Sequence, residues 1–259
     1  MSQIDSKQET QVDIESTEPV ATLPVKKPAK GVYLLPNSFT TASLFAGFYA
    51  IVAAMNGDFQ YAAIATFVSM ILDGLDGRVA RMTNTQSDFG AEYDSLADVV
   101  AFGVAPALVV FTWGLDSLGK FGWMAAFIYV AGTALRLARF NVQLEDADSR
   151  FFTGLPSPAA AGVLAGMVWS SQEYGFSGVE YAIPAAILVA AVGILMVSNF
   201  CYYSFKDLRV KGKVPFIALL AVVLVYVIIA AEPPGVLWAI FLIFAVSGPL
   251  GWLFKWKRS

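Results

Sequence analysis

The sequence predicts an all-α fold: a polytopic integral membrane bundle of about eight transmembrane helices. Hydrophobic residues make up 57% of the 259 residues and charged residues only 14%, with a mean hydropathy of +0.63. A soluble domain carries about 25% charged residues. Apolar runs recur along the chain, and most are close to the roughly 20 residues that a helix needs to cross a bilayer. Positive charges gather in alternate breaks between these runs, as expected when loops alternate between two sides of a membrane.

The chain begins with a polar segment, residues 1–31, that contains proline and shows no periodicity. Such a segment cannot bury enough apolar surface to order itself, so we expect a disordered cytoplasmic tail. It lacks the charged, apolar and small-residue regions of a signal peptide. Residues 32–254 are predicted to form the membrane-embedded domain, and 255–259 a short cytoplasmic C-terminus.

Eight apolar runs follow the tail, separated by short polar breaks, and the fifth run is the shortest. They predict helices over residues 35–55, 60–82, 91–114, 122–144, 157–171, 180–203, 214–231 and 236–254. No internal repeat is visible, and no pair of corresponding broken segments marks an inverted-repeat transporter.

The distribution of Lys and Arg supports this count, because cytoplasmic loops retain positive charge. With the tail inside, the outside breaks hold only Lys120 among the 17 cations of the chain. A wrong number of spans would mix the two sides. Both termini are therefore predicted to be cytoplasmic.

Composition also limits the chemistry. The chain has no histidine and one cysteine, which excludes imidazole-ligated metals, thiolate clusters and histidine acid–base catalysis. The net charge of −3 and the lack of a basic stripe argue against a nucleic-acid partner. Any catalysis must use carboxylates, Lys, Arg, Tyr, Ser or backbone groups.

Four aspartates stand at the cytoplasmic ends of the second and third predicted helices. Asp73 and Asp76 are three residues apart, and Asp94 and Asp98 are four apart, so each pair lies on one helix face. Carboxylates within a membrane are costly and need compensation. If the two faces meet, the oxygen cluster would hold hard divalent ions, Mg²⁺, Mn²⁺ or Ca²⁺. Two such ions commonly serve displacement at phosphorus.

The residues between the pairs suit a phosphate ligand. Gly77 and Gly90 remove side chains where a ligand must come close, Ala80 keeps the surface open, and Arg81 offers a planar donor fork. A purely structural interpretation is that Asp73 and Asp88 cap helices, Arg81 contacts headgroups and the glycines allow helix packing. That interpretation explains single residues better than the paired aspartates.

This pattern of eight positions, from Asp73 to Asp98, resembles the signature of the CDP-alcohol phosphotransferases at every position. The resemblance implies a six-helix core, two divalent metals and a cytoplasmic site in which an alcohol displaces CMP from a CDP-linked donor. Carried onto this chain, it implies that Asp73, Asp76, Asp94 and Asp98 hold the metals and that Asp98 is the general base. Asp76, Gly77, Ala80, Arg81 and Gly90 would bind CDP.

The stretches LLPNSFTTASLFAGF (34–48), DVVAFGVAPA (98–107), LRLARFNVQ (135–143), FTGLPSPAAAG (152–162) and SNFCYYSFKDL (198–208) are similar to the phosphatidylserine synthase branch. The resemblance then implies transfer of a phosphatidyl group from CDP-diacylglycerol to L-serine, directly or through a phosphatidyl-enzyme. It also implies a homodimer in the inner membrane of a prokaryote. Arg136 and Arg139, on one helix face beside Asn141, could bind the serine carboxylate.

Two alternatives stay open at this point. The acceptor could be another alcohol, such as glycerol 3-phosphate or inositol phosphate, because the aspartate signature would be the same. The aspartates could instead form the ion relay of a transporter, as intramembrane carboxylates often do. The clustering at one face and the missing repeat favour the enzyme.

Overall fold

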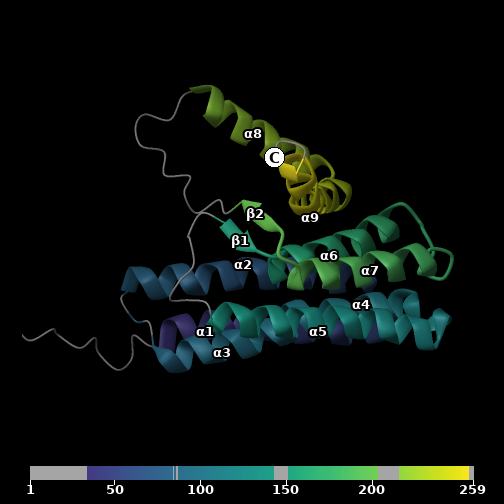
Figure 1. Cartoon of the computed structure of the whole chain (residues 1–259), viewed down its shortest axis with the longest axis horizontal. Coiled ribbons are helices and arrows are strands. Elements are labelled where there is room, and N and C mark those ends of the chain that lie inside the picture. Colours follow the sequence, from purple (N-terminus) through teal and green to yellow (C-terminus); the bar gives the residue numbers. More distant parts are fainter. Residues whose placement is uncertain (1–33, 84, 86, 143–150, 204–215, 257–259) are drawn as a thin grey trace, which may run out of the picture.

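The structure, a computed structural model, describes residues 34–83, 85, 87–142, 151–203 and 216–256. Within these ranges the chain forms a helical bundle with one small two-stranded sheet (Figure 1). The predicted tail, residues 1–31, and the end of the predicted C-terminus lie outside the described residues. The predicted all-α class is confirmed.

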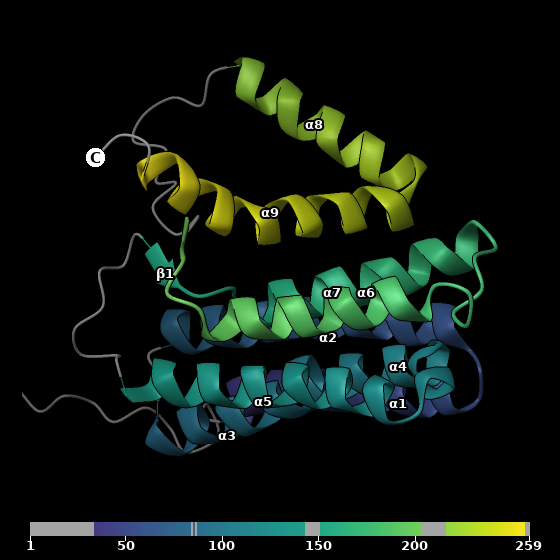
Figure 2. The same ribbon diagram turned by 45° about the vertical axis from the view of Figure 1, so that its right-hand side comes forward.

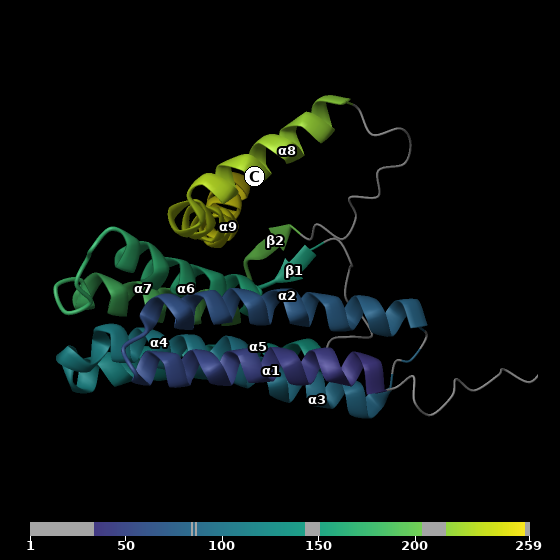
Figure 3. The same ribbon diagram turned by 180° about the vertical axis from the view of Figure 1, so that it is seen from behind.

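The first two helices form an antiparallel hairpin. α1 (Leu34–Met55) and α2 (Phe59–Thr83) are joined by a tight turn in which Gly57 has a φ of +82°, a conformation that glycine adopts at little cost. Ser43 and Ser69 donate hydrogen bonds to each other's carbonyl oxygens at 3.1 and 2.9 Å. These bonds satisfy buried polar groups between the two helices, which lie side by side in Figure 3.

The third predicted span is one continuous helix with an irregular centre. α3 (Asp88–Asp98) leads into a π-helical turn, η1 (Val99–Val104), and then into α4 (Ala105–Trp113). In a π-helix each N–H bonds the carbonyl five residues back, a pattern that often marks functional sites. A short 3₁₀ turn, η2 (Leu115–Leu118), follows.

Three further helices complete the core: α5 (Lys120–Val142), α6 (Ser157–Glu173) and α7 (Ala182–Val197). Small residues let them pack closely. A Cβ atom on Gly132 of α5 would lie 2.4 Å from the carbonyl oxygen of Gly193 on α7. This contact brings the two helix backbones together.

The predicted helix over 180–203 is too long at its C-terminal end. Ser198 has an extended backbone, and Cys201–Tyr203 forms a strand, β2, that pairs antiparallel with β1 (Phe151–Thr153). The apolar pattern continues through this segment, but the sheet supplies hydrogen-bond partners that the helix would otherwise provide. The strands join the connection after α5 to the connection after α7.

The last two helices lie on the outside of the bundle. α9 (Pro233–Trp256) packs against α6, and α8 (Phe216–Ala231) packs against α9 and stands away from the other helices (Figure 2). On α6, a Cβ atom on Gly162 would lie 2.7 Å from the Phe241 ring, and one on Gly166 2.8 Å from the Trp238 backbone. The small residues of the fifth span therefore pack on α9 of the same chain.

A helix stands at each of the eight predicted positions. By length and hydropathy, four of the described helices could cross a membrane: Pro36–Met55, Asp88–Trp113, Lys120–Val142 and Pro233–Phe254. α7 is a shorter apolar helix of 16 residues. The apolar helices identify an integral membrane protein, while the number of crossings stays a prediction.

Candidate active site

The two aspartate pairs meet between α2 and α3. Carboxylate oxygens of Asp73, Asp76 and Asp94 lie within 4.8 Å of one another. The fourth carboxyl group, that of Asp98, lies within hydrogen-bonding reach of Asp73. Asp73 and Asp76 lie within the length of α2 and not at its first turn, so they do not cap it. The helical spacing of the sequence thus brings all four acidic side chains to one place.

The geometry of this cluster fits a metal ion. Asp94 Oδ1 is buried and has no hydrogen-bond partner among the described residues. Buried polar atoms are rarely left unpaired, so this oxygen indicates a missing cationic or donor partner. Carboxylates this close repel one another unless a cation lies between them, and oxygen donors suit hard divalent ions. The aspartate cluster could therefore bind a metal.

Asp76 is held by a residue that the sequence did not identify as part of the site. Thr40 of α1 donates a hydrogen bond from Oγ1 to Asp76 Oδ2 at 2.8 Å, and both side chains are buried. This bond fixes one carboxylate oxygen and orients the other. The signal in the sequence was a polar residue in an apolar helix, three positions after Asn37, on the same helix face.

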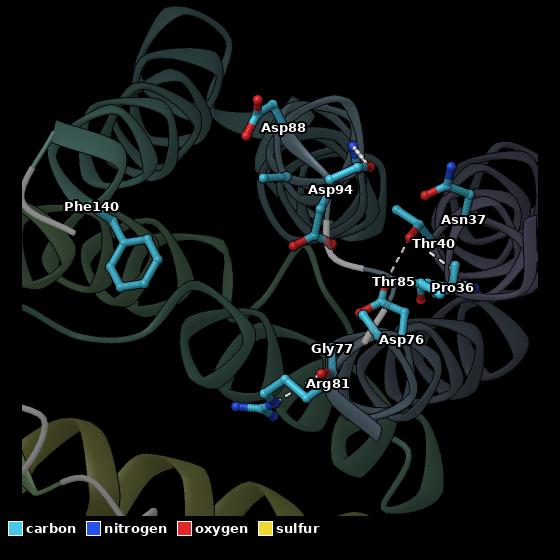
Figure 4. Close-up of a pocket in the computed structure, with 14 residues that line it drawn as sticks. Pro36, Asn37, Thr40, Asp76, Gly77, Arg81, Thr85, Asp88, Asp94 and Phe140 are labelled. Atoms are coloured by element: carbon cyan, nitrogen blue, oxygen red, sulfur yellow. Dashed lines mark hydrogen bonds between the residues drawn. The ribbon is translucent and has the colours of Figure 1, made fainter. Parts of the chain in front are cut away.

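A cavity of about 550 Å³ opens beside the cluster (Figure 4). Its volume lies within the roughly 300–1,000 Å³ typical of small-molecule sites. It is lined by Pro36, Asn37, Thr40, Asp76, Gly77, Ala80, Arg81, Thr85, Ser87, Asp88, Gly90, Ala91, Asp94 and Phe140. All five residues predicted to bind CDP are in this lining. Asp73 and Asp98 are not in the lining. Asp73 lies about one turn before Asp76 on α2, and Asp98 lies about one turn after Asp94 on α3.

Glycines leave the wall of this cavity open. A Cβ atom on Gly77 would meet nothing within 4 Å, so the missing side chain leaves free space. A Cβ atom on Gly90 would lie 3.1 Å from Ser87 Oγ and 3.4 Å from Asn37 Oδ1. Gly90 therefore serves close packing as much as ligand access.

Two further features shape the cavity wall. Ser87 caps α3 by accepting a hydrogen bond from the Gly90 N–H at 3.1 Å, so the cap is Ser87 and not Asp88. Arg81, near the end of α2, donates from Nε to the Gly77 carbonyl at 2.9 Å. The Arg81 guanidinium stands at the lower edge of the cavity in Figure 4, opposite Asp94.

The residues predicted to bind serine do not line the cavity. Arg136 is buried and donates from Nη1 to the carbonyls of Thr153 and Gly154 at 3.2 and 3.0 Å. Asn141 donates from Nδ2 to Ser95 Oγ at 3.1 Å, which links α5 to α3. Their neighbour Phe140 is the residue of α5 that reaches the cavity, and no pattern in the sequence distinguished it.

Arg139, the third of these residues, faces the end of α7. It donates from Nη2 to Asn199 Oδ1 at 2.9 Å and from Nη1 to the Val197 carbonyl at 3.4 Å. Arg136 thus contacts the backbone at the end of β1, and Arg139 contacts the last residue of α7 and the Asn199 side chain just before β2. They support this end of the bundle in addition to any role toward a ligand.

Comparisons with known proteins relate the chain to one family. A family model described as CDP-alcohol phosphatidyltransferase matches residues 33–247. A Helicobacter pylori protein named CDP-diacylglycerol–serine O-phosphatidyltransferase is 39% identical over 88% of this chain and 94% of its own length. A Mycobacterium leprae protein of the same name is 34% identical over 87% and 77% of the two chains. An archaetidylserine synthase of Methanothermobacter thermautotrophicus is 32% identical over 65% and 69%.

Proposed function

The chain belongs to the CDP-alcohol phosphatidyltransferase family, and we propose that it transfers the phosphatidyl group of CDP-diacylglycerol to the hydroxyl of L-serine. The products are phosphatidylserine and CMP. The observation that carries this proposal is the acidic cluster beside a cavity lined by the predicted CDP-binding residues. The names of the related proteins support serine as the acceptor.

The metal site is proposed to hold two divalent ions, Mg²⁺ or Mn²⁺, with Ca²⁺ as the less expected choice. Asp73, Asp76, Asp94 and Asp98 would be the ligands, in line with the unpaired oxygen of Asp94. When bound, such ions neutralise the diphosphate and stabilise charge that develops at phosphorus. Removal of divalent ions with a chelator should abolish turnover, and added Mg²⁺ or Mn²⁺ should restore it.

The chain's own residues account for the rest of the reaction. Arg81 would donate hydrogen bonds to the diphosphate, while the open wall at Gly77 admits the donor. The serine oxygen forms a bond to the phosphorus that carries diacylglycerol, and the bond from that phosphorus to CMP breaks. Asp98 would accept the proton that the serine hydroxyl loses.

We place the serine carboxylate next to the C-terminal part of α5. Arg136 stands four residues before Phe140, so the two lie on one helix face, and Phe140 lines the cavity. Arg136 or Arg139 would pair with the carboxylate, with Asn141 nearby on the same helix. Both guanidinium groups already donate to backbone carbonyls, so one of these donors would have to turn to the carboxylate when serine binds.

The orientation of the protein follows from the cation distribution. We propose that both termini and the aspartate cluster face the cytoplasm of a prokaryotic cell. A cysteine introduced at Asn56 should react with an impermeant reagent added outside intact cells, and one at Lys211 should not. The reverse labelling pattern contradicts this orientation. The expected homodimer also stays a prediction, which light scattering of the purified protein in detergent would check.

Release of CMP from CDP-diacylglycerol by the purified protein tests the function. We expect release that depends on serine and is lost in Asp73→Asn. Glycerol 3-phosphate and inositol phosphate should not replace serine. Faster release with either alcohol would reassign the acceptor, and no release with any of them would favour the ion-transport alternative.

A further inference from the structure

The π-helical turn η1 begins directly after Asp98 and has a local chemical cause. Pro106 lies inside the continuous helix and has no N–H group, so it cannot bond the carbonyl four residues earlier, that of Phe102. Next to it, the Ala105 N–H bonds the Val100 carbonyl, five residues back. The proline therefore leaves the Phe102 carbonyl without its usual helical donor.

A side chain from α5 supplies the missing donor. The Tyr129 hydroxyl donates a hydrogen bond to the Phe102 carbonyl at 2.8 Å, and both residues are fully buried. An unpaired carbonyl at such a position would be costly, because no water reaches it. Tyr129 thus satisfies the backbone at the turn that follows Asp98.

The same arrangement occurs a second time in this chain. Pro249 stands inside α9, and the carbonyl four residues before it, that of Ala245, accepts a hydrogen bond from the Tyr202 hydroxyl at 3.0 Å. Tyr202 is also fully buried. The two tyrosine–proline pairs share their chemistry and burial, but the second joins β2 to α9, and its tyrosine lies close to Arg136.

Close packing on two sides limits the movement of the π-helical turn η1. A Cβ atom on Gly47 of α1 would lie 2.8 Å from the Ala101 backbone, and one on Gly103 would lie 3.1 Å from Thr133 of α5. The turn is therefore held on one side by α1 and on the other by α5. The hydrogen bond from Tyr129 fixes the direction of the Phe102 carbonyl, which lies one turn after Asp98.

We propose that Tyr129 is a positioning residue for the aspartate cluster. Its hydroxyl bond to Phe102 holds the π-helical turn and thereby the direction of the Asp98 carboxyl group toward Asp73. Tyr129 itself is not among the residues that line the cavity. This inference rests on the proposed function, because it assigns the held carboxylate a part in phosphatidyl transfer.

The test compares Tyr129→Phe with the matched control Tyr202→Phe. Each variant removes one buried hydroxyl from a carbonyl freed by proline, so both should lower the unfolding temperature in detergent. With serine at saturation, which removes any effect of Tyr202 on serine affinity through Arg136, only Tyr129→Phe should lower kcat, by about 10- to 100-fold, because small displacements of reacting groups are costly. The KM for CDP-diacylglycerol should change by less than about twofold, since the cavity residues are untouched.

A readout that does not depend on turnover is the stabilisation by Mn²⁺. The Mn²⁺ concentration that gives half of the rise in unfolding temperature should increase several-fold in Tyr129→Phe and stay unchanged in Tyr202→Phe. Parental kcat and parental Mn²⁺ dependence in Tyr129→Phe would overturn the positioning role. Equal losses of kcat at saturating serine in both tyrosine variants would also overturn it.

Restoring the backbone donor gives a second test that holds even if Tyr129→Phe does not fold. Pro106→Ala supplies an N–H opposite the Phe102 carbonyl, so adding Tyr129→Phe to it should cost less than about twofold in kcat. A tenfold loss of kcat on adding Tyr129→Phe to Pro106→Ala would show that the Tyr129 hydroxyl does not act by pairing with the Phe102 carbonyl. Absence of CMP release by the parent protein, in contrast, would refute the proposed function and leave the Mn²⁺ comparison to judge the positioning role.

Discussion

Replacing Thr40 with valine tests whether the bond to Asp76 matters for the reaction. Valine has the shape of threonine but no hydroxyl, and Thr40 is only 4% exposed, so the substitution removes the 2.8 Å hydrogen bond without opening a cavity. A hydrogen bond to a charged acceptor contributes about 1.5–3 kcal/mol. If all of this free energy serves to orient Asp76 for the reaction, kcat/KM for CDP-diacylglycerol should fall about 10- to 150-fold, because each factor of ten corresponds to 1.4 kcal/mol.

The assay is CMP release over a range of CDP-diacylglycerol and Mg²⁺ concentrations. Thr40→Ser keeps the hydroxyl and should retain most of the activity. Thr41→Val is the matched control, because the exposed Thr41 bonds Tyr93 at 2.9 Å on another side of α1. A Thr40→Val enzyme within about twofold of the parent would refute the reasoning and leave Asp76 held by other contacts.

Three further predictions concern the base, the acceptor and the packing. Asp98→Asn should lower kcat by roughly 10²–10⁴-fold while CDP-lipid binding persists, and more than about a tenth of parental turnover would remove its role as base. Arg136→Lys or Arg139→Lys should raise the KM for serine by roughly 5- to 150-fold, equivalent to 1–3 kcal/mol. The KM for CDP-diacylglycerol should change little. An unchanged KM for serine in both variants excludes the contact between an arginine and the serine carboxylate. Gly132→Ala should lower the free energy of unfolding by about 1–3 kcal/mol because its Cβ would meet the α7 backbone, whereas Gly251→Ala, with open space, should not.

Spacing along helices predicted the centre of the site well. The i,i+3 and i,i+4 aspartates come together, and the predicted CDP-binding residues line one cavity, because both depend on which side chains share a helix face. The eight helix positions followed from apolar runs of nearly sufficient length. These are local properties, which a sequence displays directly.

Contacts between distant segments were not predictable in the same way. Thr40 and Phe140 reach the cavity from α1 and α5. Nothing in the local sequence distinguishes Phe140 from a packing residue, and the polarity of Thr40 does not reveal that its partner is Asp76 on α2. The apolar pattern predicts a helix through Cys201–Tyr203, but the segment forms a strand because it pairs with β1, about 50 residues earlier in the chain. The hydroxyl that pairs with the Phe102 carbonyl in the π-helical turn likewise comes from another helix.

The α1–α2 hairpin has a consequence for how the protein enters the membrane. α2 is not among the four described helices that are long and apolar enough to cross alone, because it carries Asp73, Asp76 and two arginines. Its partner α1 is among them, and the hydroxyls of Thr40, Ser43 and Ser69 bond across the pair. During synthesis, the apolar helix emerges first and offers these polar partners to the one that follows. The machinery of insertion would therefore release the two helices into lipid as a unit, and Asp73 and Asp76 would enter the membrane together with α1.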